Sequence, residues 1–393
     1  MTSDKELRAR TRAFLDEHQP GADGEREFLE ALFDAGLAAV HYPPGHGGLG
    51  LRRSQQSAVD AELAAAGARL PDPSRNVIGL GMAAPTIIAF GTEEQKSRWL
   101  RPLWLADEIW CQLFSEPGAG SDVAGLATRA VKDGGDWIVT GQKVWTSLAH
   151  LSRWGLLVAR TDPDVPKHAG LSYFVVDMTA PGVEVRPLRQ ATGEAEFNEV
   201  FLNQVRIPDS ARLGEVGQGW KVAQTTLMNE RVSLGASRPV PREGSTIGYA
   251  ARGWRERPER RTPELHQRLL RLWARAEVAR LAGERLRQQI AAGQPGPEGS
   301  AAKLVMARLN QEISGFEVEF GGVGALRYDD WTMRREGSTD YSRGPGYRYL
   351  RSKGNSIEGG TSEILRNIIA ERVLGLPPEQ RPDKGVPWKE LPR

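Results

Sequence analysis

The stretches DWIVTG (residues 136–141) and KVWTS (residues 143–147) decide the fold class of this 393-residue chain. Both are rich in β-branched and aromatic residues and lie between turn residues, a pattern typical of β-strands. Further runs of this kind are WGLLVAR, LSYFVVDM, GVEVRPL and EVFLNQVRI, with turn signals roughly every ten residues. Because no helix-length pattern interrupts them, residues 109–213 are predicted to form a small β-sandwich or barrel.

Helical patterns flank this β region on both sides. In the first helical candidate, DKELRARTRAFLDEH, the residues Leu7, Thr11 and Phe14 recur at helical intervals. The candidates that follow the β region are long enough for bundle helices. The chain is therefore predicted to be an α+β multidomain protein, with an N-terminal α-helical bundle (1–108), a β domain (109–213), a C-terminal four-helix-type bundle (214–376) and an irregular, Pro-rich tail (377–393).

Composition excludes several classes of protein. The 52 Lys and Arg residues nearly balance the 50 Asp and Glu residues, and the net charge of +2 argues against nucleic acid as the main partner. No stretch approaches the ~20 apolar residues of a membrane helix, and the N-terminus carries charges where a signal peptide is apolar. The single cysteine, Cys111, excludes an intrachain disulfide, and the six histidines lack metal-ligand spacing. We therefore expect a cytoplasmic protein without a metal site or a membrane partner.

The first candidate site is the loop FSEPGAGSD at residues 114–122. Its glycines allow the backbone to approach a flat cofactor closely, and its N–H groups can face a polar ligand. Trp145, Thr146 and Ser147 lie on a predicted strand of the same domain, where an indole can stack on a heterocycle and hydroxyls can donate to it. An ordinary turn and a core tryptophan are the alternative interpretations.

The second candidate is Glu230. Steps of three and four residues from Trp220 pass through Ala223, Leu227, Glu230 and Leu234, so this carboxylate falls within an apolar helical stripe. Burial raises the pKa of a carboxyl group toward the range useful for a general base. A structural ion pair with an arginine is the alternative.

The third candidate is EGGTSE at residues 358–363. Two glycines precede Thr361, which is predicted to cap a helix that begins at Ser362. The N–H groups at that helix N-terminus could polarise a carbonyl group or hold a phosphate. A capped helix after a tight turn, without a function of its own, is the alternative.

Taken together, these motifs resemble the acyl-CoA dehydrogenase family along nearly the whole chain. Six segments match the family's signatures in the family's order: residues 90–103, 113–130, 141–147, 197–208, 214–232 and 359–375. The resemblance implies bound FAD, an acyl-CoA thioester substrate and a fold in which a β domain lies between two helical domains.

The resemblance also assigns residues to the site. Flavin contacts would be Phe114, Ser115, Gly120 and Ser121 in the loop, Trp145, Thr146 and Ser147 on the strand, and Thr361 and Glu363 at the last helix. The acyl-CoA site would be lined by Ser121, Met228, Asn229 and Arg231.

The position of the catalytic base distinguishes subgroups of the family. Many members carry a Glu directly before the Gly-Thr of the last motif, where this chain has Gly359, whereas a minority carry it on the helix that here holds Glu230. The resemblance therefore implies that Glu230 removes the α-proton and that the backbone N–H of Gly359, with a flavin hydroxyl, stabilises charge on the thioester oxygen. The β-hydride would pass to flavin N5, giving a trans-2-enoyl thioester, and an electron-transferring flavoprotein would take the electrons. Glu358 is the rival base.

One family motif is missing. An Arg followed by a Phe-Gly turn usually reaches the FAD of a neighbouring subunit, but here the stretch is RGWRERPERRTPEL, and Val318 replaces a common Gln. A homo-oligomer (dimer or tetramer) and a heteromer with a related subunit both stay open, as does an acyl carrier protein in place of CoA. A flavin monooxygenase on the same fold and a non-catalytic subunit are the alternative functions.

Overall fold

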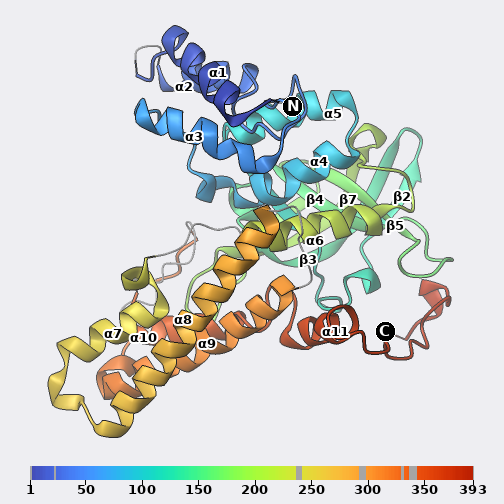
Figure 1. Cartoon of the computed structure of the whole chain (residues 1–393). Coiled ribbons are helices and arrows are strands. Elements are labelled where there is room, and N and C mark those ends of the chain that lie inside the picture. The colour runs from blue at the N-terminus through green and yellow to red at the C-terminus, as the bar shows by residue number, and fades with distance from the viewer. Residues whose placement is uncertain are drawn as a thin grey trace.

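The structure is a computed structural model that describes residues 2–21, 24–235, 241–291, 298–328, 332–335 and 343–392. The side chains of residues 230–235, 290–291 and 298 also lie outside the described part. A helical region, a β-sheet and a second helical region follow one another along the chain (Figure 1). This order confirms the predicted architecture.

Among its described residues, the N-terminal region contains five α-helices: α1 (Asp4–Glu17), α2 (Glu25–Asp34), α3 (Gln56–Ala65), α4 (Ala84–Phe90) and α5 (Glu93–Trp104). The predicted stripe of α1 is confirmed, since Leu7, Thr11 and Phe14 are its buried residues. Thr92 caps α5 by accepting the N–H of Gln95, whose side chain accepts the N–H of Thr92 in return. A π-helical turn, η3 (Gly79–Ala83), leads directly into α4.

The middle region is one curled sheet of seven strands: β1 (Trp110–Leu113), β2 (Arg129–Asp133), β3 (Asp136–Ser147), β4 (Trp154–Arg160), β5 (Leu171–Asp177), β6 (Val183–Pro187) and β7 (Phe197–Pro208). The strand order is β1-β4-β2-β3-β7-β6, and β5 pairs with β4. DWIVTG and KVWTS, predicted as separate runs, form the single strand β3. It stays paired with β7 across two register shifts, and such irregularities let a long strand bend without ending.

The described part of the C-terminal region contains the four predicted long helices and two more: α6 (Gly219–Gly235), α7 (Thr246–Glu256), α8 (Pro263–Ala291), α9 (Glu298–Gly321), α10 (Pro345–Gly354) and α11 (Ser362–Arg372). The sequence pattern missed α7 because arginines interrupt it. Ile247 and Ala250 are nevertheless buried on one face of α7. None of the described helices combines the length and the apolar composition that crossing a bilayer requires.

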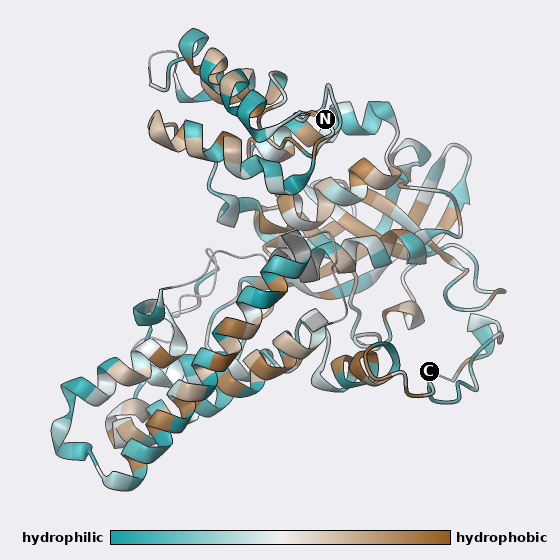
Figure 2. Ribbon diagram, in the orientation of Figure 1, coloured by the Kyte–Doolittle hydropathy of each residue, from teal (hydrophilic) through white to brown (hydrophobic). Residues whose placement is uncertain are grey.

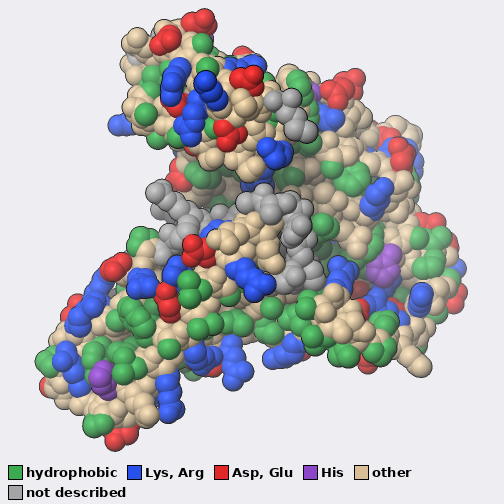
Figure 3. Space-filling model, in the orientation of Figure 1, with side chains coloured by type: hydrophobic (Ala, Val, Ile, Leu, Met, Phe, Trp, Pro, Cys, Tyr) green, Lys and Arg blue, Asp and Glu red, His purple; other side chains and the backbone are tan. Residues whose placement is uncertain are grey.

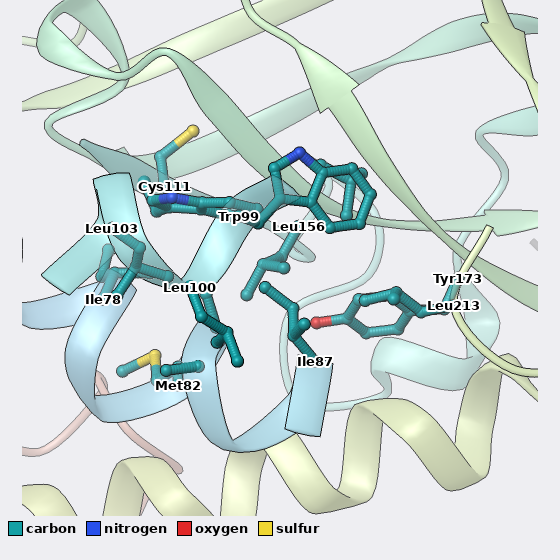
Figure 4. Close-up of a cluster of buried hydrophobic side chains, with 14 of the residues drawn as sticks. Ile78, Met82, Ile87, Trp99, Leu100, Leu103, Cys111, Leu156, Tyr173 and Leu213 are labelled. Atoms are coloured by element: carbon teal, nitrogen blue, oxygen red, sulfur yellow. The ribbon is translucent and has the colours of Figure 1, made fainter. Parts of the chain in front are cut away.

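Two hydrophobic cores hold these regions. The larger core joins the N-terminal helices, the sheet and the first half of α6, and Figure 4 shows part of it around Trp99, Leu100 and Tyr173. The smaller core joins α7, α8 and α9 around Phe316 and Phe320. In Figure 2 the most hydrophobic residues accordingly follow the central strands, whereas α8 alternates between hydrophobic and hydrophilic residues. The first half of α6 therefore belongs to the sheet-side core.

Candidate active site

The predicted flavin loop lies against strand β3. The carbonyl oxygen of Ser115 accepts the backbone N–H of Val144 at 2.9 Å. The carbonyl oxygen of Phe114 accepts a hydrogen bond from Nζ of Lys143 at 3.0 Å. These bonds place the FSEPGAGSD loop directly beside Trp145, Thr146 and Ser147, so the tertiary fold brings together two motifs that the sequence separates.

A buried ion pair fixes this arrangement. Nζ of Lys143, which is fully buried, lies 2.8 Å from Oε1 of Glu116 and also donates to the carbonyl oxygen of Val158. The Glu116 carboxylate accepts the backbone N–H groups of Ala127 and Thr128 as well. Burial acts to raise the pKa of Glu116, but the Lys143 charge and these hydrogen bonds outweigh it and hold the pKa below its ordinary value. The first residues of the loop are therefore anchored to the sheet by charge.

This ion pair was not predicted from the sequence. The sequence does contain a sign of it, because Glu116 and Lys143 are charged residues in segments that are otherwise predicted to be apolar or turn-forming. Charges at such positions are rare unless they are paired, because an unpaired buried charge is costly.

Trp145 is presented to solvent, which is unusual for a large aromatic residue. Its side chain is 57% exposed, and its backbone φ is +58° in the left-handed region. A bulky residue rarely adopts that conformation, and strain of this kind clusters at functional sites. The ring contacts Phe197 with centroids 5.9 Å apart and leaves much of its surface open. The alternative of a core tryptophan is therefore excluded.

The residues after Trp145 alternate between the two faces of the strand. Thr146 is fully buried, and its hydroxyl has no hydrogen-bond partner among the described residues. Its carbonyl oxygen accepts a hydrogen bond from the Asn198 amide at 3.0 Å. Ser147 is half-buried, so its hydroxyl is closer to the surface than that of Thr146. Of the two hydroxyls, Ser147 is the better placed to reach a ligand beside Trp145.

The loop leaves room for a flat cofactor. A Cβ added at Gly118 or Gly120 would meet no atom within 4 Å, so the backbone there borders open space. Phe114 is buried and packs edge-on against Tyr173 with ring centroids 5.8 Å apart, so its ring faces the protein interior. Ser121 is exposed. An open glycine-rich backbone beside an exposed indole fits a flavin ring.

Helix α6 is tied to this site through buried hydroxyl groups. Oγ1 of Thr226 lies 2.9 Å from both the Tyr173 hydroxyl and Oγ1 of Thr86 on α4. Position 230 is one helical turn beyond Thr226 on the same face of α6. The side chains of Glu230 and Arg231 lie outside the described residues. The structure therefore orients the helix that carries the predicted base.

The two remaining predicted substrate contacts lie on the same helix. Met228 is 64% exposed, which leaves its thioether free to meet a ligand. The Asn229 amide donates to the carbonyl oxygen of Thr225 at 2.9 Å.

The last predicted motif forms the expected capped helix. Gly359 and Gly360 have φ values of +61° and +96°, which glycine adopts without strain. The Thr361 hydroxyl accepts the N–H of Ile364 at 3.2 Å and caps α11. Nζ of Lys303 on α9 donates to the carbonyl oxygen of Gly360 at 2.7 Å. The turn is therefore fixed to the C-terminal bundle.

The acids of this motif are already engaged. Glu363 is exposed and pairs with Arg366 at 3.0 Å. Glu358 pairs with Arg351 at 2.9 Å and accepts the Asn355 amide at 2.7 Å, which leaves it poorly available as a base. Among the described residues, no hydrogen bond or ion pair joins residues 359–363 to the loop or to β3. The structure thus joins the loop to β3 directly and ties α6 to β5 and α4, whereas the hydrogen bonds described for the last motif run to α9 and within α11.

Three family models match the chain consecutively. They are described as the N-terminal domain of acyl-CoA dehydrogenase (residues 2–106), its middle domain (residues 111–205) and its C-terminal domain (residues 217–374).

Two curated relatives come from Mycobacterium tuberculosis. Acyl-CoA dehydrogenase IpdE1 is 38% identical over 374 residues, which cover 92% of this chain and 92% of that protein. Acyl-CoA dehydrogenase FadE34 is 42% identical over 350 residues, which cover 88% of this chain but 46% of that protein. The chain therefore spans about half the length of FadE34.

Two solved structures are similar over almost the whole chain. The Tcur3481-Tcur3483 steroid ACAD is 28% identical with a TM-score of 0.72, covering 96% of this chain and 98% of that one. The ChsE4-ChsE5 complex from Mycobacterium tuberculosis is 29% identical with a TM-score of 0.68, covering 96% and 99%.

Proposed function

Because this chain belongs to the acyl-CoA dehydrogenase family, we propose that it oxidises an acyl-CoA thioester to the trans-2-enoyl thioester with FAD as cofactor. The observation that carries the proposal is the exposed Trp145 at φ +58° beside an open, glycine-rich loop that a buried ion pair anchors. We also propose domain limits at 108/109, 213/214 and 376/377. Two of these limits are supported by the gaps between Trp104 and Trp110 and between Pro208 and Gly219.

The residues that would hold FAD are grouped at the loop, at β3 and at the last helix. They are Phe114, Ser115, Gly120, Ser121, Trp145, Thr146, Ser147, Thr361 and Glu363. When bound, FAD would supply the acceptor for the hydride that leaves the β-carbon of the substrate. Trp145 would contribute its exposed ring, whereas the side chains of Phe114 and Thr146 are buried.

The chain itself would move the proton. In the proposed mechanism Glu230 removes the proton from the α-carbon, and the backbone N–H of Gly359 donates to the thioester oxygen and stabilises the developing negative charge. The orientation of α6 by Thr226 supports the first role, and the engagement of Glu358 by Arg351 disfavours the rival base. Ser121, Met228, Asn229 and Arg231 would contact the acyl-CoA.

We further propose that the chain works in an oligomer, and that a heteromer with a related subunit is the better choice over a homo-oligomer. The Tcur3481-Tcur3483 steroid ACAD and the ChsE4-ChsE5 complex are each named after two different proteins. The C-terminal bundle also exposes apolar side chains, several of which are more than half exposed: Leu270, Val278 and Leu281 on α8, and Val323 and Leu326 after α9. Figure 3 shows hydrophobic side chains gathered along this bundle, and such patches mark interaction surfaces.

The identity of the acyl group is also a proposal. Because one neighbour is described as a steroid ACAD, we include steroid side-chain thioesters beside fatty acyl-CoAs as candidate substrates. An acyl carrier protein thioester is the alternative carrier. We propose that an electron-transferring flavoprotein receives the electrons.

The test is the visible spectrum of the purified chain before and after anaerobic addition of a panel of acyl-CoA thioesters. Wild-type protein should lose the oxidised flavin band near ~450 nm, Glu230→Gln should retain it, and the matched control Glu358→Gln should bleach like wild type. Bleaching by Glu230→Gln at the wild-type rate would refute Glu230 as the base. A yellow protein that no thioester bleaches would favour oxygenase chemistry or an acyl carrier protein as the carrier of the acyl group. A colourless protein would indicate that a partner subunit is missing.

A further inference from the structure

The C-terminal tail, predicted to be irregular, is docked on the β domain. After α11 the chain passes beneath the sheet and turns toward the strands near β5 (Figure 1). The backbone N–H of Trp388 donates to the carbonyl oxygen of Val165 at 2.9 Å, and that of Lys389 donates to the carbonyl oxygen of Pro163 at 3.1 Å. Pro387 also forms an isolated bridge with Pro166. The tail has little regular structure, but it is held in a defined place.

Trp388 anchors the tail to the segment that follows the flavin loop. Its side chain is 9% exposed, and its indole N–H donates to the carbonyl oxygen of Gly125 at 3.1 Å. The guanidinium carbon of Arg160 lies 4.2 Å from the centre of the indole, a cation–π contact. Arg160 is itself buried and donates to the carbonyl oxygens of Ala124 and Leu126. Trp388 and Arg160 thus donate hydrogen bonds to the carbonyl oxygens of three consecutive residues, 124–126.

An ion bridge joins the tail to the last residue of the loop. Nζ of Lys167 lies 2.8 Å from Asp122 and 2.7 Å from Asp383. Asp122 is the final residue of FSEPGAGSD, and Asp383 belongs to the tail. One lysine charge therefore holds the two acids, and the two segments that carry them, together.

Between these anchors, Glu116 and Ala119 exchange two backbone hydrogen bonds, and the glycines on either side of Ala119 are the unsupported part of the loop. The N-terminal side of the loop is held by the Lys143–Glu116 pair, whereas Gly118 and Gly120 border open space. Glycine-rich segments lose much conformational entropy on ordering, so anchoring both ends lowers the entropy lost when a ligand orders the middle. The tail supplies the anchor at the C-terminal end.

We propose that residues 383–391 form a strap that positions the FSEPGAGSD loop for its ligand, with Trp388, Arg160 and Lys167 as positioning residues. Residues 373–382 connect the strap to α11, which contains Glu363 and is capped by Thr361. The inference rests on the proposed function for the identity of that ligand, FAD. The ordering of residues 122–126 by the strap is independent of it.

The test compares the full chain with Trp388→Ala and with a deletion of residues 381–393. The dissociation constant for FAD is measured by titrating the apoprotein, and amide hydrogen exchange is measured in the apoprotein without FAD. Both variants should bind FAD at least about tenfold more weakly, because an unanchored loop must be ordered on binding. The amides of Gly125 and Leu126, which donate within the loop end, should exchange faster.

Matched variants separate positioning from general destabilisation. Lys384→Ala changes an exposed residue of the same tail and should leave both measurements at wild-type values. Trp388→Phe keeps an aromatic ring but loses the indole N–H, so it should retain more of the FAD affinity than Trp388→Ala. Lys167→Met removes both ion pairs and keeps the tryptophan anchor, and it serves if Trp388→Ala fails to fold.

The outcomes distinguish the two proposals. Wild-type FAD affinity and unchanged exchange at residues 122–126 in Trp388→Ala or Lys167→Met would overturn the strap and leave the proposed function intact. If the wild-type chain alone binds no FAD, a partner subunit is needed to complete the flavin site, and the exchange measurement alone decides whether the tail orders the loop.

Discussion

Replacing Lys143 by methionine tests the ion pair on which the candidate site is built. Lys143 is fully buried and Glu116 nearly so, and removing one partner of such a pair costs about 3–5 kcal/mol because an uncompensated charge stays buried. Glu116 would keep the N–H groups of Ala127 and Thr128, so we expect the lower end, about 3 kcal/mol. That loss corresponds to roughly a 150-fold change in the folding equilibrium.

A double-mutant cycle isolates the interaction from the loss of packing. Glu116→Gln leaves the lysine charge buried and should cost a similar amount, whereas Lys143→Met combined with Glu116→Gln removes both charges. The double variant should therefore be more stable than the sum of the single variants predicts, by about 2 kcal/mol.

The assay is urea unfolding followed by circular dichroism and tryptophan fluorescence. The control is Arg186→Met, which breaks the exposed Arg186–Glu184 pair and should cause no measurable change in the free energy of unfolding. If each single variant lowers the free energy of unfolding by less than about 1 kcal/mol, or if the two effects are strictly additive, the Lys143–Glu116 ion pair does not anchor the loop.

Three further predictions concern other parts of the site and the fold. Trp145→Ala should leave the free energy of unfolding nearly unchanged, because the ring is 57% exposed, and should weaken FAD binding about tenfold; equal affinity in a titration would contradict its role as ring contact. Thr226→Val should cost about 1–2 kcal/mol, because the buried Tyr173 hydroxyl loses its partner, whereas Thr225→Val on the half-exposed side of α6 should not; equal urea midpoints would exclude this hydroxyl link. Burial, together with the charge of Arg53, lowers the pKa of His41 to about 4, so the unfolded chain binds a proton below pH ~6.5 that the folded chain refuses until about pH 4. The contribution of His41 to the free energy of unfolding is therefore fully present above pH ~6.5. As the pH falls toward 4, the free energy of unfolding decreases by up to about 3 kcal/mol. His41→Gln should lose that much less stability between pH 7 and pH 4 in parallel urea titrations, and identical losses would show that His41 titrates normally.

Local patterns in the sequence determined the order of helical, β and helical regions. Hydrophobic period and turn residues act over a few neighbours, so strands such as β4 and β5 and the long C-terminal helices could be predicted. The helix caps Thr92 and Thr361 were predictable for the same reason, since a capping hydroxyl bonds a backbone N–H about three residues away. Helices α7 and α10 were missed because their charged residues hide the apolar faces that tertiary packing buries.

The candidate site depended on contacts that no local pattern contains. The Lys143–Glu116 bond joins residues 27 positions apart, and the Trp388–Gly125 bond joins residues 263 positions apart. Whether a charge is paired in the interior or solvated on the surface is decided when β3 and the loop come together, and so is the engagement of Glu358 by Arg351. The sequence alone therefore predicted the order of the three regions and most of their long elements, and it named the motifs that are proposed to carry the chemistry. The tertiary structure decided which charges are buried and which segments hold the loop, because both depend on neighbours that only folding supplies.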